Sequence, residues 1–539
     1  MTELPAAVQQ WLSHDPDPGS AAELAACTEE ELADRFARPL AFGTAGLRGP
    51  LRAGPNGMNL AVVLRTTWAI AQVLLDRSHG GSPVVVGYDA RHRSAEFGRA
   101  AAEVFAAQGF PPTLMPVPVP TPAVAFAVRS SGAAAGVQIT ASHNPATDNG
   151  YKVYLTGGLQ IVTPTDQAIE SAIAAAPPAD EIPRAVVTPS GADQLRGYVE
   201  HAAAVRRTCG STRVALTPMH GVGGEFALDA LALAGFDDLH VVDRQFAPDP
   251  DFPTVDFPNP EEPGAVDELL GLAADIDADI AVALDPDADR CAIGVRSPSG
   301  WRMLTGDETG WLLGDYILSD CESATAVVAS TVVSSRMLAS IAADHGARHI
   351  ETLTGFKWLA RADMNIPDFP DATLVYAYEE AIGHCVDPAA VRDKDGISAA
   401  VLLCDLVVAL RRRGSTILDA LDDLARRHGV HTTTAVTRRV ETSEAAAALM
   451  ARLRAAPPQH VAGFAVSVTD LAGSTVSATD ALVFSGADDS ASVRIVTRPS
   501  GTESKLKSYI EVRCDGDLPL ARERAARLQG AVAAAVRQW

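Results

Sequence analysis

Apolar, strand-like runs alternate with long Ala-rich runs of helical period along most of this chain. The runs PVVVGYD, RVALTPM and ATAVVAST are followed by the helical runs SAEFGRAAAEVFAAQGF, GGEFALDALALAGF and SRMLASIAADHGA, respectively. Strands that alternate with helices form right-handed crossovers on parallel or mixed sheets. The alternation therefore predicts α/β architecture. The chain must fold as several domains, because its 539 residues exceed the ~250–300 residues that a single hydrophobic core supports.

The alternation changes near residue 437. From there the chain reads as strand-like pieces, TTTAVTRRVET, FAVSVTD, ALVFSG and SVRIVTRPSG, followed by one closing helix, ARERAARLQGAVAAAVRQW. A group of strands and a helix that do not alternate is typical of an α+β unit. We therefore expect a final α+β domain of about 100 residues.

The charge balance restricts the possible partners. The chain has 44 basic and 67 acidic residues, which gives a formal net charge of −23. A nucleic-acid surface requires a basic face, so we expect no nucleic-acid partner. Because the net charge also repels anions at long range, a phosphate site would need basic residues that are concentrated locally.

The apolar segments predict neither secretion nor membrane insertion. The first residues, MTELPAAVQQ, carry acidic and polar side chains where a signal peptide needs a basic start and an apolar run. The run MNLAVVLRTTWAIAQVLL is interrupted by Arg65 and two threonines, so it falls short of the ~18 apolar residues of a spanning helix. We expect it to be an amphipathic core helix. Seven scattered cysteines without C-x-x-C spacing indicate small buried residues in a reducing cytoplasm, with no zinc site.

Three aspartates crowd together directly after an apolar run. In DIAVALDPDADRCAIGV, Asp285, Asp287 and Asp289 occupy alternate positions, which places their carboxylates on one side of an extended segment. Like charges at this spacing repel one another, and a hard cation such as Mg²⁺ relieves the repulsion. A calcium loop is excluded because Arg290 and Arg296 stand where Gly and Glu are required. A solvated acidic turn is the structural alternative.

The same segment is also similar to the haloacid-dehalogenase phosphatases, in which the first Asp of a D-x-D motif is the phosphorylated nucleophile. That family has Thr or Val two positions after the second Asp, where this chain has Asp289. The departure counts against a phosphatase with Asp285 as nucleophile, which stays an alternative.

Two Gly-containing turns have the composition of phosphate-binding loops. Backbone N–H groups, hydroxyls and an Arg fork together bind phosphate well, although PSGT alone is also a common surface turn. Neither turn matches the Walker sequence. The first turn, AFGTAGLRG, contains Arg48, and the second, RPSGTES, contains Arg498, Ser500, Gly501, Thr502 and Ser504.

The segment TASHNP follows the apolar run AAAGVQI. This context either exposes the Ser142 hydroxyl at the end of a strand or simply forms a turn. The G-x-S-x-G sequence of serine hydrolases is missing, and GVGGEF breaks the dinucleotide-binding pattern. A serine together with metal-binding carboxylates and phosphate-binding turns suits phosphoryl transfer, in which positioning and charge neutralisation provide most of the catalysis.

Four motifs, TASHNP, DPDADR, EEAIG and RPSGTES, occur in this order over nearly the whole chain. Together they resemble the α-D-phosphohexomutase family, the phosphoglucomutases and phosphomannomutases. The resemblance implies three related α/β domains and a smaller C-terminal α+β domain around a central cleft. We expect these domains at 1–207 with the phosphoserine loop, 208–318 with the metal loop, 319–436 with the sugar-contacting loop and 437–539 with the phosphate-binding loop.

The resemblance also implies roles for individual residues. Ser142 would carry the transferable phosphate, supported by His143 and Asn144. Lys152 would act in general acid/base work. One Mg²⁺ per chain would bind Asp285, Asp287, Asp289 and a phosphoserine oxygen. Arg48 and Arg290 would face the transferring phosphoryl group, and the substrate and its second phosphate would contact Lys357, Glu380, His384, Arg498, Ser500, Gly501, Thr502 and Ser504.

The implied reaction interconverts hexose 1-phosphate and hexose 6-phosphate, of glucose or mannose, through a phosphoserine enzyme and a hexose 1,6-bisphosphate. The sugar-contacting loop departs from the GEMSG of many bacterial phosphomannomutases, since Ile382 in EEAIG cannot hydrogen-bond a hydroxyl. FGTAGLRG with EEAIG resembles a branch that includes phosphopentomutases, so ribose or deoxyribose 1-phosphate is an alternative substrate. A non-catalytic sugar-phosphate binder is an alternative from another class. The oligomeric state is left open.

Overall fold

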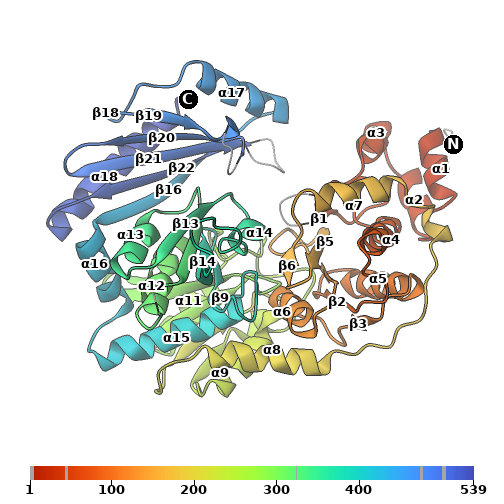
Figure 1. Cartoon of the computed structure of the whole chain (residues 1–539), viewed down its shortest axis with the longest axis horizontal. Helices are drawn as coiled ribbons and strands as arrows, with labels where there is room; N and C mark the ends of the chain where they lie inside the picture. Colours follow the sequence, from red (N-terminus) through yellow and green to blue (C-terminus); the bar gives the residue numbers. More distant parts are fainter. Residues whose placement is uncertain (1–4, 43–45, 323, 474–477, 500–504) are drawn as a thin grey trace. The chain divides into compact units, whose positions relative to one another are not determined.

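The computed structural model describes residues 5–42, 46–322, 324–473, 478–499 and 505–539 (Figure 1). The chain divides into two compact units. Unit 1 comprises Met1–Met303 and Gly383–Val408, and unit 2 comprises Leu304–Ile382 and Ala409–Trp539. Each unit contains two large β-sheets with their helices. The predicted α/β class is confirmed.

The first sheet, in unit 1, is mixed and has the order β1-β5-β4-β2-β3, with β6 paired to β5. Strand β2 is parallel to β3 and β4, whereas β5 is antiparallel to β4 and β1. The helices α1 (Ala6–Leu12), α2 (Ser20–Ala25) and α3 (Glu29–Ala37) precede it. Its strands are β1 (Leu47–Pro50), β2 (Val84–Tyr88), β3 (Pro112–Leu114), β4 (Ala135–Ile139), β5 (Asp148–Leu155) and β6 (Leu159–Gln160).

Helices cover both faces of the first sheet. Val84 and Val86 face a core that they share with α4 and α5. On the other face, α6 lies very close to the strands, because a Cβ added at Gly87 or Gly136 would meet valines of α6 at 2.4 and 2.2 Å. The helical elements are α4 (Leu60–Asp76), α5 (Ser94–Ala107), α6 (Thr121–Ser131), α7 (Thr165–Ala174), η1 (Ala179–Glu181) and α8 (Ala192–Ala204).

The second sheet, also in unit 1, has the order β11-β10-β9-β7-β8. Strand β7 is parallel to β8 and β9, and β9, β10 and β11 form antiparallel pairs. Its strands are β7 (Val214–Thr217), β8 (Leu239–Val241), β9 (Ile280–Leu284), β10 (Cys291–Ser297) and β11 (Gly300–Met303). The other elements of this part are α9 (Gly223–Leu233), α10 (Asp243–Phe246), α11 (Asp267–Asp275), β15 (Gly383–Cys385) and α15 (Gly396–Arg412), whose last residues belong to unit 2.

Unit 2 contains a parallel sheet, the third sheet, in which β13 and β14 flank β12. Alternate residues of its strands face helices on the two sides, and α12 packs against both β14 and α13. Its elements are α12 (Gly306–Leu318), β12 (Ala326–Thr331), α13 (Met337–Asp344), β13 (Arg348–Thr352), α14 (Phe356–Leu359), β14 (Thr373–Glu379) and α16 (Ile417–His428).

The fourth sheet, in unit 2, is antiparallel, with the order β16-β22-β21-β20-β19. Helices α17 and α18 bury one of its faces. Its elements are β16 (Val430–Arg439), α17 (Ser443–Ala455), β17 (His460–Val461), β18 (Phe464–Ala465), β19 (Ser467–Asp470), η2 (Leu471–Gly473), β20 (Leu482–Ala487), β21 (Ala491–Pro499), β22 (Lys505–Cys514) and α18 (Leu518–Val536).

Several local expectations are confirmed. The run around Arg65 forms the core helix α4, and the closing helix is α18. The predicted domain boundaries stay a proposal: residue 207 lies between α8 and β7, residue 318 ends α12 and residue 436 lies within β16. Among the described helices, none is long and apolar enough to cross a membrane.

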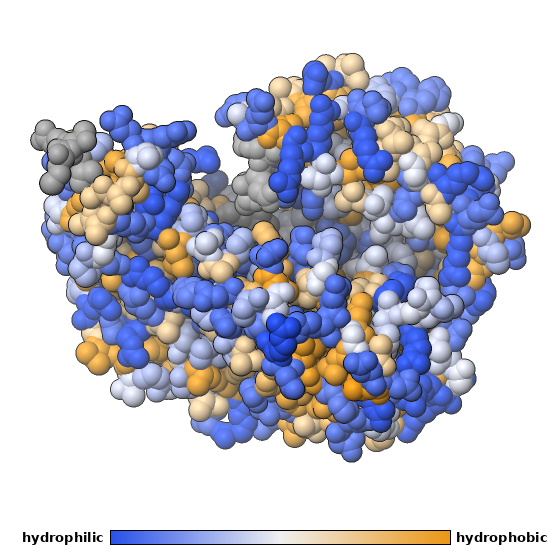
Figure 2. All heavy atoms as spheres, turned by 180° about the vertical axis from the view of Figure 1, so that it is seen from behind, coloured by the Kyte–Doolittle hydropathy of each residue, from blue (hydrophilic) through white to orange (hydrophobic). Residues whose placement is uncertain are grey.

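Hydrophilic residues dominate the face of the molecule in Figure 2, interrupted by small hydrophobic groups. The large hydrophobic side chains that are exposed in the described ranges come from well-separated segments. Scattered exposed apolar residues are normal for a folded protein. They are Leu75, Val117, Val186, Leu233, Phe257, Met364 and Leu520.

Asp307, near the start of α12, is a buried carboxyl group in unit 2. Its Oδ1 accepts hydrogen bonds of 2.9 Å from both the Ser335 backbone N–H and the Tyr378 hydroxyl. Burial raises the pKa of Asp307 to about 7. The folded state therefore holds this proton more tightly than the unfolded chain does, so the stability that Asp307 contributes at low pH is lost as pH rises towards 7.

We predict that Asp307→Asn lowers the free energy of unfolding more at pH 5 than at pH 8. The difference between the two pH values should be roughly 2 kcal/mol, because only the wild type loses a proton from this site over the interval. Urea unfolding of both proteins at both pH values measures it, and Asp368→Asn, at an exposed site, is the control. Equal destabilisation at pH 5 and pH 8 would contradict the prediction.

Candidate active site

Ser142 lies in a tight turn directly after β4. It has a left-handed backbone conformation, with φ of 53°, which is uncommon for a residue other than Gly and is often found at functional sites. Its N–H donates a hydrogen bond of 2.8 Å to Thr140 Oγ1. The side chain is only 2 % exposed. The segment therefore forms a turn, and the turn fixes the direction of the serine hydroxyl.

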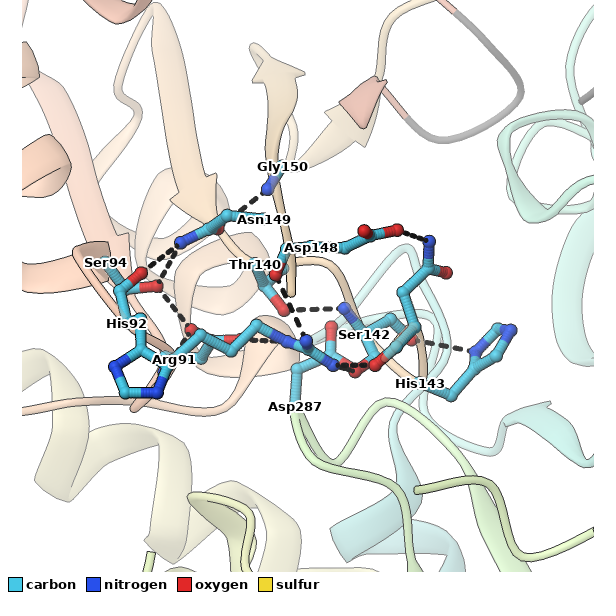
Figure 3. Close-up of polar contacts among 12 residues, drawn as sticks. Arg91, His92, Ser94, Thr140, Ser142, His143, Asp148, Asn149, Gly150 and Asp287 are labelled. Carbon is cyan, nitrogen blue, oxygen red and sulfur yellow. Dashed lines mark hydrogen bonds and ion pairs between the residues drawn. The ribbon is translucent and has the colours of Figure 1, made fainter. Parts of the chain in front are cut away.

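Arg91 holds this turn by its backbone, and the sequence analysis missed this residue. The guanidinium is buried and donates to the carbonyl oxygens of Ser142, Asn144 (2.6 Å), Pro145 (2.7 Å) and Asp148 (3.2 Å) (Figure 3). Four charge-assisted hydrogen bonds to one loop leave it little conformational freedom. Arg91 follows β2 in the segment YDARHRS, and the position of an Asp-x-Arg pattern after a strand is the signal that could have identified it.

Asp89 forms a buried ion pair with the same Arg91 guanidinium. Its carboxylate lies 3.3 Å from Arg91 Nε and accepts hydrogen bonds from the Arg91 N–H (3.0 Å) and the Ser94 hydroxyl (2.6 Å). Burial raises the pKa of Asp89, and the charge of Arg91 opposes the rise. The carboxylate and the guanidinium thus depend on each other inside the first sheet.

The serine hydroxyl meets the aspartate group. Asp285, Asp287 and Asp289 lie in the turn between β9 and β10, and one ligand atom of each falls within 4.8 Å of the others. Ser142 Oγ donates a hydrogen bond of 2.8 Å to Asp285 Oδ2, across 143 residues of sequence. The Arg290 N–H donates to the other Asp285 oxygen at 3.1 Å. The serine turn and the aspartate turn therefore form one site, as the family resemblance implied.

Lys152, on β5, neutralises two of these carboxylates. Its Nζ lies 2.7 Å from Asp287 Oδ2 and 2.8 Å from Asp289 Oδ2. Burial alone would lower the pKa of Lys152, but the two carboxylates raise it above the ordinary value. The ammonium group is therefore protonated at neutral pH. In this arrangement Lys152 stabilises charge or donates a proton, and it is poorly suited to act as a base.

Thr121 and Lys394 complete the surroundings of the aspartates, and both were missed in the sequence. Thr121, the first residue of α6, donates from Oγ1 to Asp287 Oδ2 at 2.5 Å and from its N–H to the Asp287 carbonyl at 2.9 Å. Lys394 Nζ lies 3.2 Å from Asp289 Oδ2. The charged segment RDKDG before α15 was the only sequence signal for Lys394.

Close backbone contact brings Lys394 to the aspartate turn. The Gly396 N–H donates to the Ala288 carbonyl at 3.1 Å. A Cβ at Gly396 would lie 2.4 Å from the Arg290 carbonyl oxygen, so this position has no room for a side chain. The start of α15 is therefore fixed against the turn between β9 and β10.

The three carboxylates differ in pKa because their neighbours differ. Burial, followed by the charges of Asp287 and Asp289, raises the pKa of Asp285 well above its usual value. Burial also acts on Asp287 and Asp289, but Lys152 overcomes it at Asp287, and Lys152, Lys394 and Arg290 do so at Asp289, so both pKa values are lowered. Asp285 is thus the member with the least cationic compensation.

The oxygen atoms of the group fit a hard cation. Lys152 and Thr121 occupy the Oδ2 atoms, whereas the buried Oδ1 atoms of Asp287 and Asp289 accept no hydrogen bond from any described residue. Buried carboxylate oxygens normally have partners, and three convergent carboxylates with the serine oxygen match the oxygen donors that Mg²⁺ prefers. The Asp triad can hold one metal ion.

Basic residues are concentrated at this site, as a phosphate site in an acidic protein requires. Arg48, on β1, donates to Asn144 Oδ1 at 2.9 Å, and Arg290 Nε lies 3.7 Å from Asp289 Oδ1. His143 Nδ1 lies 3.3 Å from Ser142 Oγ. Burial, then the charges of Arg290 and Arg48, lower the pKa of His143 well below its usual value, so the imidazole is neutral and its unprotonated nitrogen can accept a hydrogen bond.

The predicted substrate-contacting residues of unit 2 lie in separate elements. Lys357 is in α14, with Nζ 5.9 Å from the Trp358 ring centre. Glu380 follows β14 and accepts hydrogen bonds from Thr331 (3.1 Å) and Ser334 (3.0 Å). Arg498 is on β21 opposite Lys507. Ser500, Gly501, Thr502 and Ser504 lie outside the described residues, so nothing here tests them.

The structure places His384, a predicted sugar contact, in the core. His384 lies on β15 in unit 1, with 0 % of its surface exposed, and burial lowers the pKa of its imidazole to about 3. The side chain is a neutral part of the core and offers no exposed atom to a ligand. Proximity to Glu380 in sequence did not reveal this burial.

Comparisons with known proteins agree with the site. Three family descriptions, "Phosphoglucomutase/phosphomannomutase, alpha/beta/alpha domain" I, II and III, match residues 39–179, 196–299 and 305–428. The chain belongs to the phosphoglucomutase/phosphomannomutase family. The match confirms the predicted family and its architecture of three α/β domains, and the antiparallel fourth sheet supplies the final α+β part.

The relatives of this phosphoglucomutase/phosphomannomutase family member are named for different sugars. A probable phosphomannomutase of Haemophilus influenzae is 38% identical over 85% of this chain and 93% of its own length. A phosphopentomutase of Mus musculus is 36% identical, with shares of 79% and 74%. A phosphoglucomutase of Staphylococcus aureus is 30% identical, with shares of 90% and 91%.

A solved structure confirms the fold of the family. A phosphoglucomutase/phosphomannomutase family protein from Burkholderia thailandensis aligns with a TM-score of 0.67 and 21% identity, over 92% of this chain and 97% of that one. The relatives are named as mutases, which supports assigning the chain to the isomerases.

We predict that Arg91→Lys loosens the serine turn. A lysine ammonium cannot reproduce the planar fork that reaches several carbonyl oxygens at once, and the freed carbonyls lose buried partners. Amide hydrogen exchange of the peptides covering residues 140–149 should be at least tenfold faster than in the wild type. Arg93→Lys, at a half-exposed arginine paired with Glu96, is the matched control. Unchanged protection in Arg91→Lys would rule out this role.

Proposed function

We propose that this protein is a phosphosugar mutase in which Ser142 carries the transferred phosphoryl group, and that it interconverts hexose 1-phosphate and hexose 6-phosphate of glucose or mannose. The observation that carries the proposal is the hydrogen bond of 2.8 Å between Ser142 Oγ and Asp285 Oδ2. It joins a rigidly held hydroxyl to a group of metal-binding carboxylates. The family match favours Ser142 over Asp285 as the nucleophile, against the phosphatase alternative.

Asp285, Asp287 and Asp289 would hold one Mg²⁺ together with the serine oxygen. When bound, the ion neutralises negative charge on the transferring phosphoryl group. Lys152 keeps Asp287 and Asp289 ionised and in place by its two ion pairs. The same ammonium is positioned to stabilise charge that develops next to these carboxylates.

The proposed reaction has two transfers. In the first, the bond between phosphorus and Ser142 Oγ breaks while phosphorus bonds to a free sugar hydroxyl; the hydroxyl loses its proton and Ser142 Oγ gains one. In the second, the other phosphate of the resulting hexose 1,6-bisphosphate returns to Ser142 Oγ. Arg48 and Arg290 would stabilise the charge on the transferring group. The neutral His143 imidazole, 3.3 Å from Ser142 Oγ, can accept a hydrogen bond from the serine hydroxyl.

The phosphate that is not transferred needs its own site. We assign it to Arg498 and to the turn Ser500, Gly501, Thr502 and Ser504, with Lys357 as a further cation and Glu380 as the partner of sugar hydroxyls. Hexose 1,6-bisphosphate would serve as both intermediate and activator. The seven cysteines are all free thiols, which supports a reducing cytoplasmic location.

Phosphopentomutase activity is the second candidate function. The Ile382 side chain is 1 % exposed and has a φ of 53°, so it offers a sugar neither a hydroxyl nor a surface. A Cβ at Gly306 would lie 1.9 Å from the Glu380 carbonyl oxygen, which leaves this loop little room to adapt. Relatives named phosphopentomutase are 36% identical to the chain, and they favour ribose or deoxyribose 1-phosphate as the alternative.

We predict that Ser142→Ala lowers mutase activity by at least a thousandfold, because no phosphoenzyme forms. The control, Ser131→Ala at the exposed end of α6, should retain full activity. Phosphate trapped on the wild type should resist hydroxylamine, which cleaves an acyl phosphate but not a serine phosphate. Full activity of Ser142→Ala, or release by hydroxylamine, would disprove the serine mechanism.

We predict that glucose 1-phosphate or mannose 1-phosphate has a kcat/KM at least tenfold above that of ribose 1-phosphate, since hydroxyl contacts separate such substrates strongly. The assay compares these three with N-acetylglucosamine 1-phosphate, in the presence of Mg²⁺ and a trace of the matching bisphosphate. A preference for ribose 1-phosphate would identify a phosphopentomutase. If the protein bound these sugar phosphates but converted none of them, it would be a non-catalytic binder.

A further inference from the structure

The fourth sheet has one apolar face and one polar face. The apolar face packs against α17 and α18. On the other face, the strand registers align two polar rows: His431, Arg513 and Ser492 lie across from one another, and Glu511 and Arg494 form the next row. Alternate residues of a strand share a face, so both rows project to the same side. Arg498, farther along β21, has a role in the proposed mechanism, whereas these two rows have none.

A cavity of about 690 Å³ opens over this polar face in unit 2. Its size falls within the range of about 300–1,000 Å³ typical of small-molecule sites. The sheet provides one wall and the side of α13 the other. The lining residues from α13 and its first turn are Arg336, Ala339, Ser340 and Ala343, and those from the sheet are His431, Ser485, Gly486, Ala487, Ser492, Val493, Arg494, Glu511 and Arg513.

His431 is the buried lining residue that indicates ligand binding. Its side chain is only 3 % exposed, and its Nδ1 lies 2.8 Å from Glu511 Oε1. Nε2 has no hydrogen-bond partner in the described part of the chain. An unpaired buried ring nitrogen costs free energy, so a polar group in the cavity would stabilise it.

Arg336 is the available cation at the cavity. It is exposed, and its guanidinium forms no ion pair or hydrogen bond with the residues that the structure covers. The other two arginines are partly neutralised: Arg494 lies 3.0 Å from Glu351, and Arg513 lies 2.6 Å from Asp515.

Glu511 does not cancel this positive charge at the cavity surface. Its Oε1 already accepts hydrogen bonds from the Ser335 hydroxyl, the Arg336 N–H (2.9 Å) and His431. The charge of Arg336 also reaches His349, where burial and then the charges of Arg336 and Arg494 lower the pKa to about 4. Arg494 and Arg513 are paired with carboxylates outside the lining and Glu511 is bonded internally, so Arg336 leaves the lining with an excess of positive charge that favours an anion.

We propose that this cavity binds a small phosphorylated metabolite, through the Arg336 guanidinium and His431 Nε2, at a site separate from Ser142. Phosphate fits both groups: its oxygens match the arginine fork, and it pairs with Nε2 in either protonation state. A protonated imidazole donates to a phosphate oxygen, and a neutral one accepts from a phosphate hydroxyl. Arg494 and Arg513 add positive charge at the floor of the cavity.

Titration calorimetry with inorganic pyrophosphate, on the full chain without added Mg²⁺, tests the proposal. Wild type should show a binding event that Arg336→Ala weakens at least tenfold. Arg336 is exposed, so this variant should fold as the wild type does. The matched control is Arg452→Ala, an exposed arginine on α17 on the apolar side of the sheet, and it should bind as the wild type does. Arg48→Ala should keep the same event, because Arg48 belongs to the Ser142 site.

A crystal soaked in tungstate provides the second measurement. We expect the anion between the Arg336 guanidinium and His431 Nε2. Identical pyrophosphate titrations of wild type and Arg336→Ala, or ordered water alone in the cavity of soaked crystals, would overturn the proposal.

Discussion

The ion pairs of Lys152 with Asp287 and Asp289 are the interaction on which the rest of the site depends. Three buried carboxylates cannot remain close together without compensating charge, because their repulsion and desolvation are both large. A single ammonium 2.7 and 2.8 Å from two of them supplies that charge, and it also takes up the Oδ2 atoms. The Oδ1 atoms therefore stay available for a cation. Because Lys152 is on the first sheet and the aspartates follow a strand of the second, the same contact aligns two sheets within unit 1.

Close backbone packing then fixes the distances around this ionic centre. Gly87 and Gly136 let α6 approach the first sheet, which places Thr121 against Asp287. Gly396 allows the start of α15 to approach the aspartate turn and bring Lys394 with it. The serine beside these groups is buried, which limits the access of water to a phosphoryl group attached there. Glycines without any chemical role thus determine how the charged residues meet.

The sequence predicted those features of the site that local motifs encode. It did not predict those that depend on contacts between residues far apart in the chain. The alternation of strands and helices, the family, and the meeting of Ser142 with the aspartates were predicted. Arg91 and Thr121 were missed because a single Arg or Thr after a strand looks like an ordinary turn residue, and their partners lie far away in sequence. The burial of His384 was not foreseen, because its sequence neighbours do not show that β15 is buried. The predicted phosphate contacts of Ser500, Gly501, Thr502 and Ser504 lie outside the described residues and stay a prediction.

Arg91 binds the serine turn through carbonyl oxygens, which every residue type possesses. The shape of the turn is therefore largely independent of the side chains that occupy positions 143 to 147, provided that each tolerates its backbone angles. Such a loop can change its chemistry while keeping its geometry. For evolution or protein engineering, this separates two requirements that usually conflict: the hydroxyl stays aimed at the metal-binding group, while the side chains of the turn can be chosen for the chemistry they add beside it.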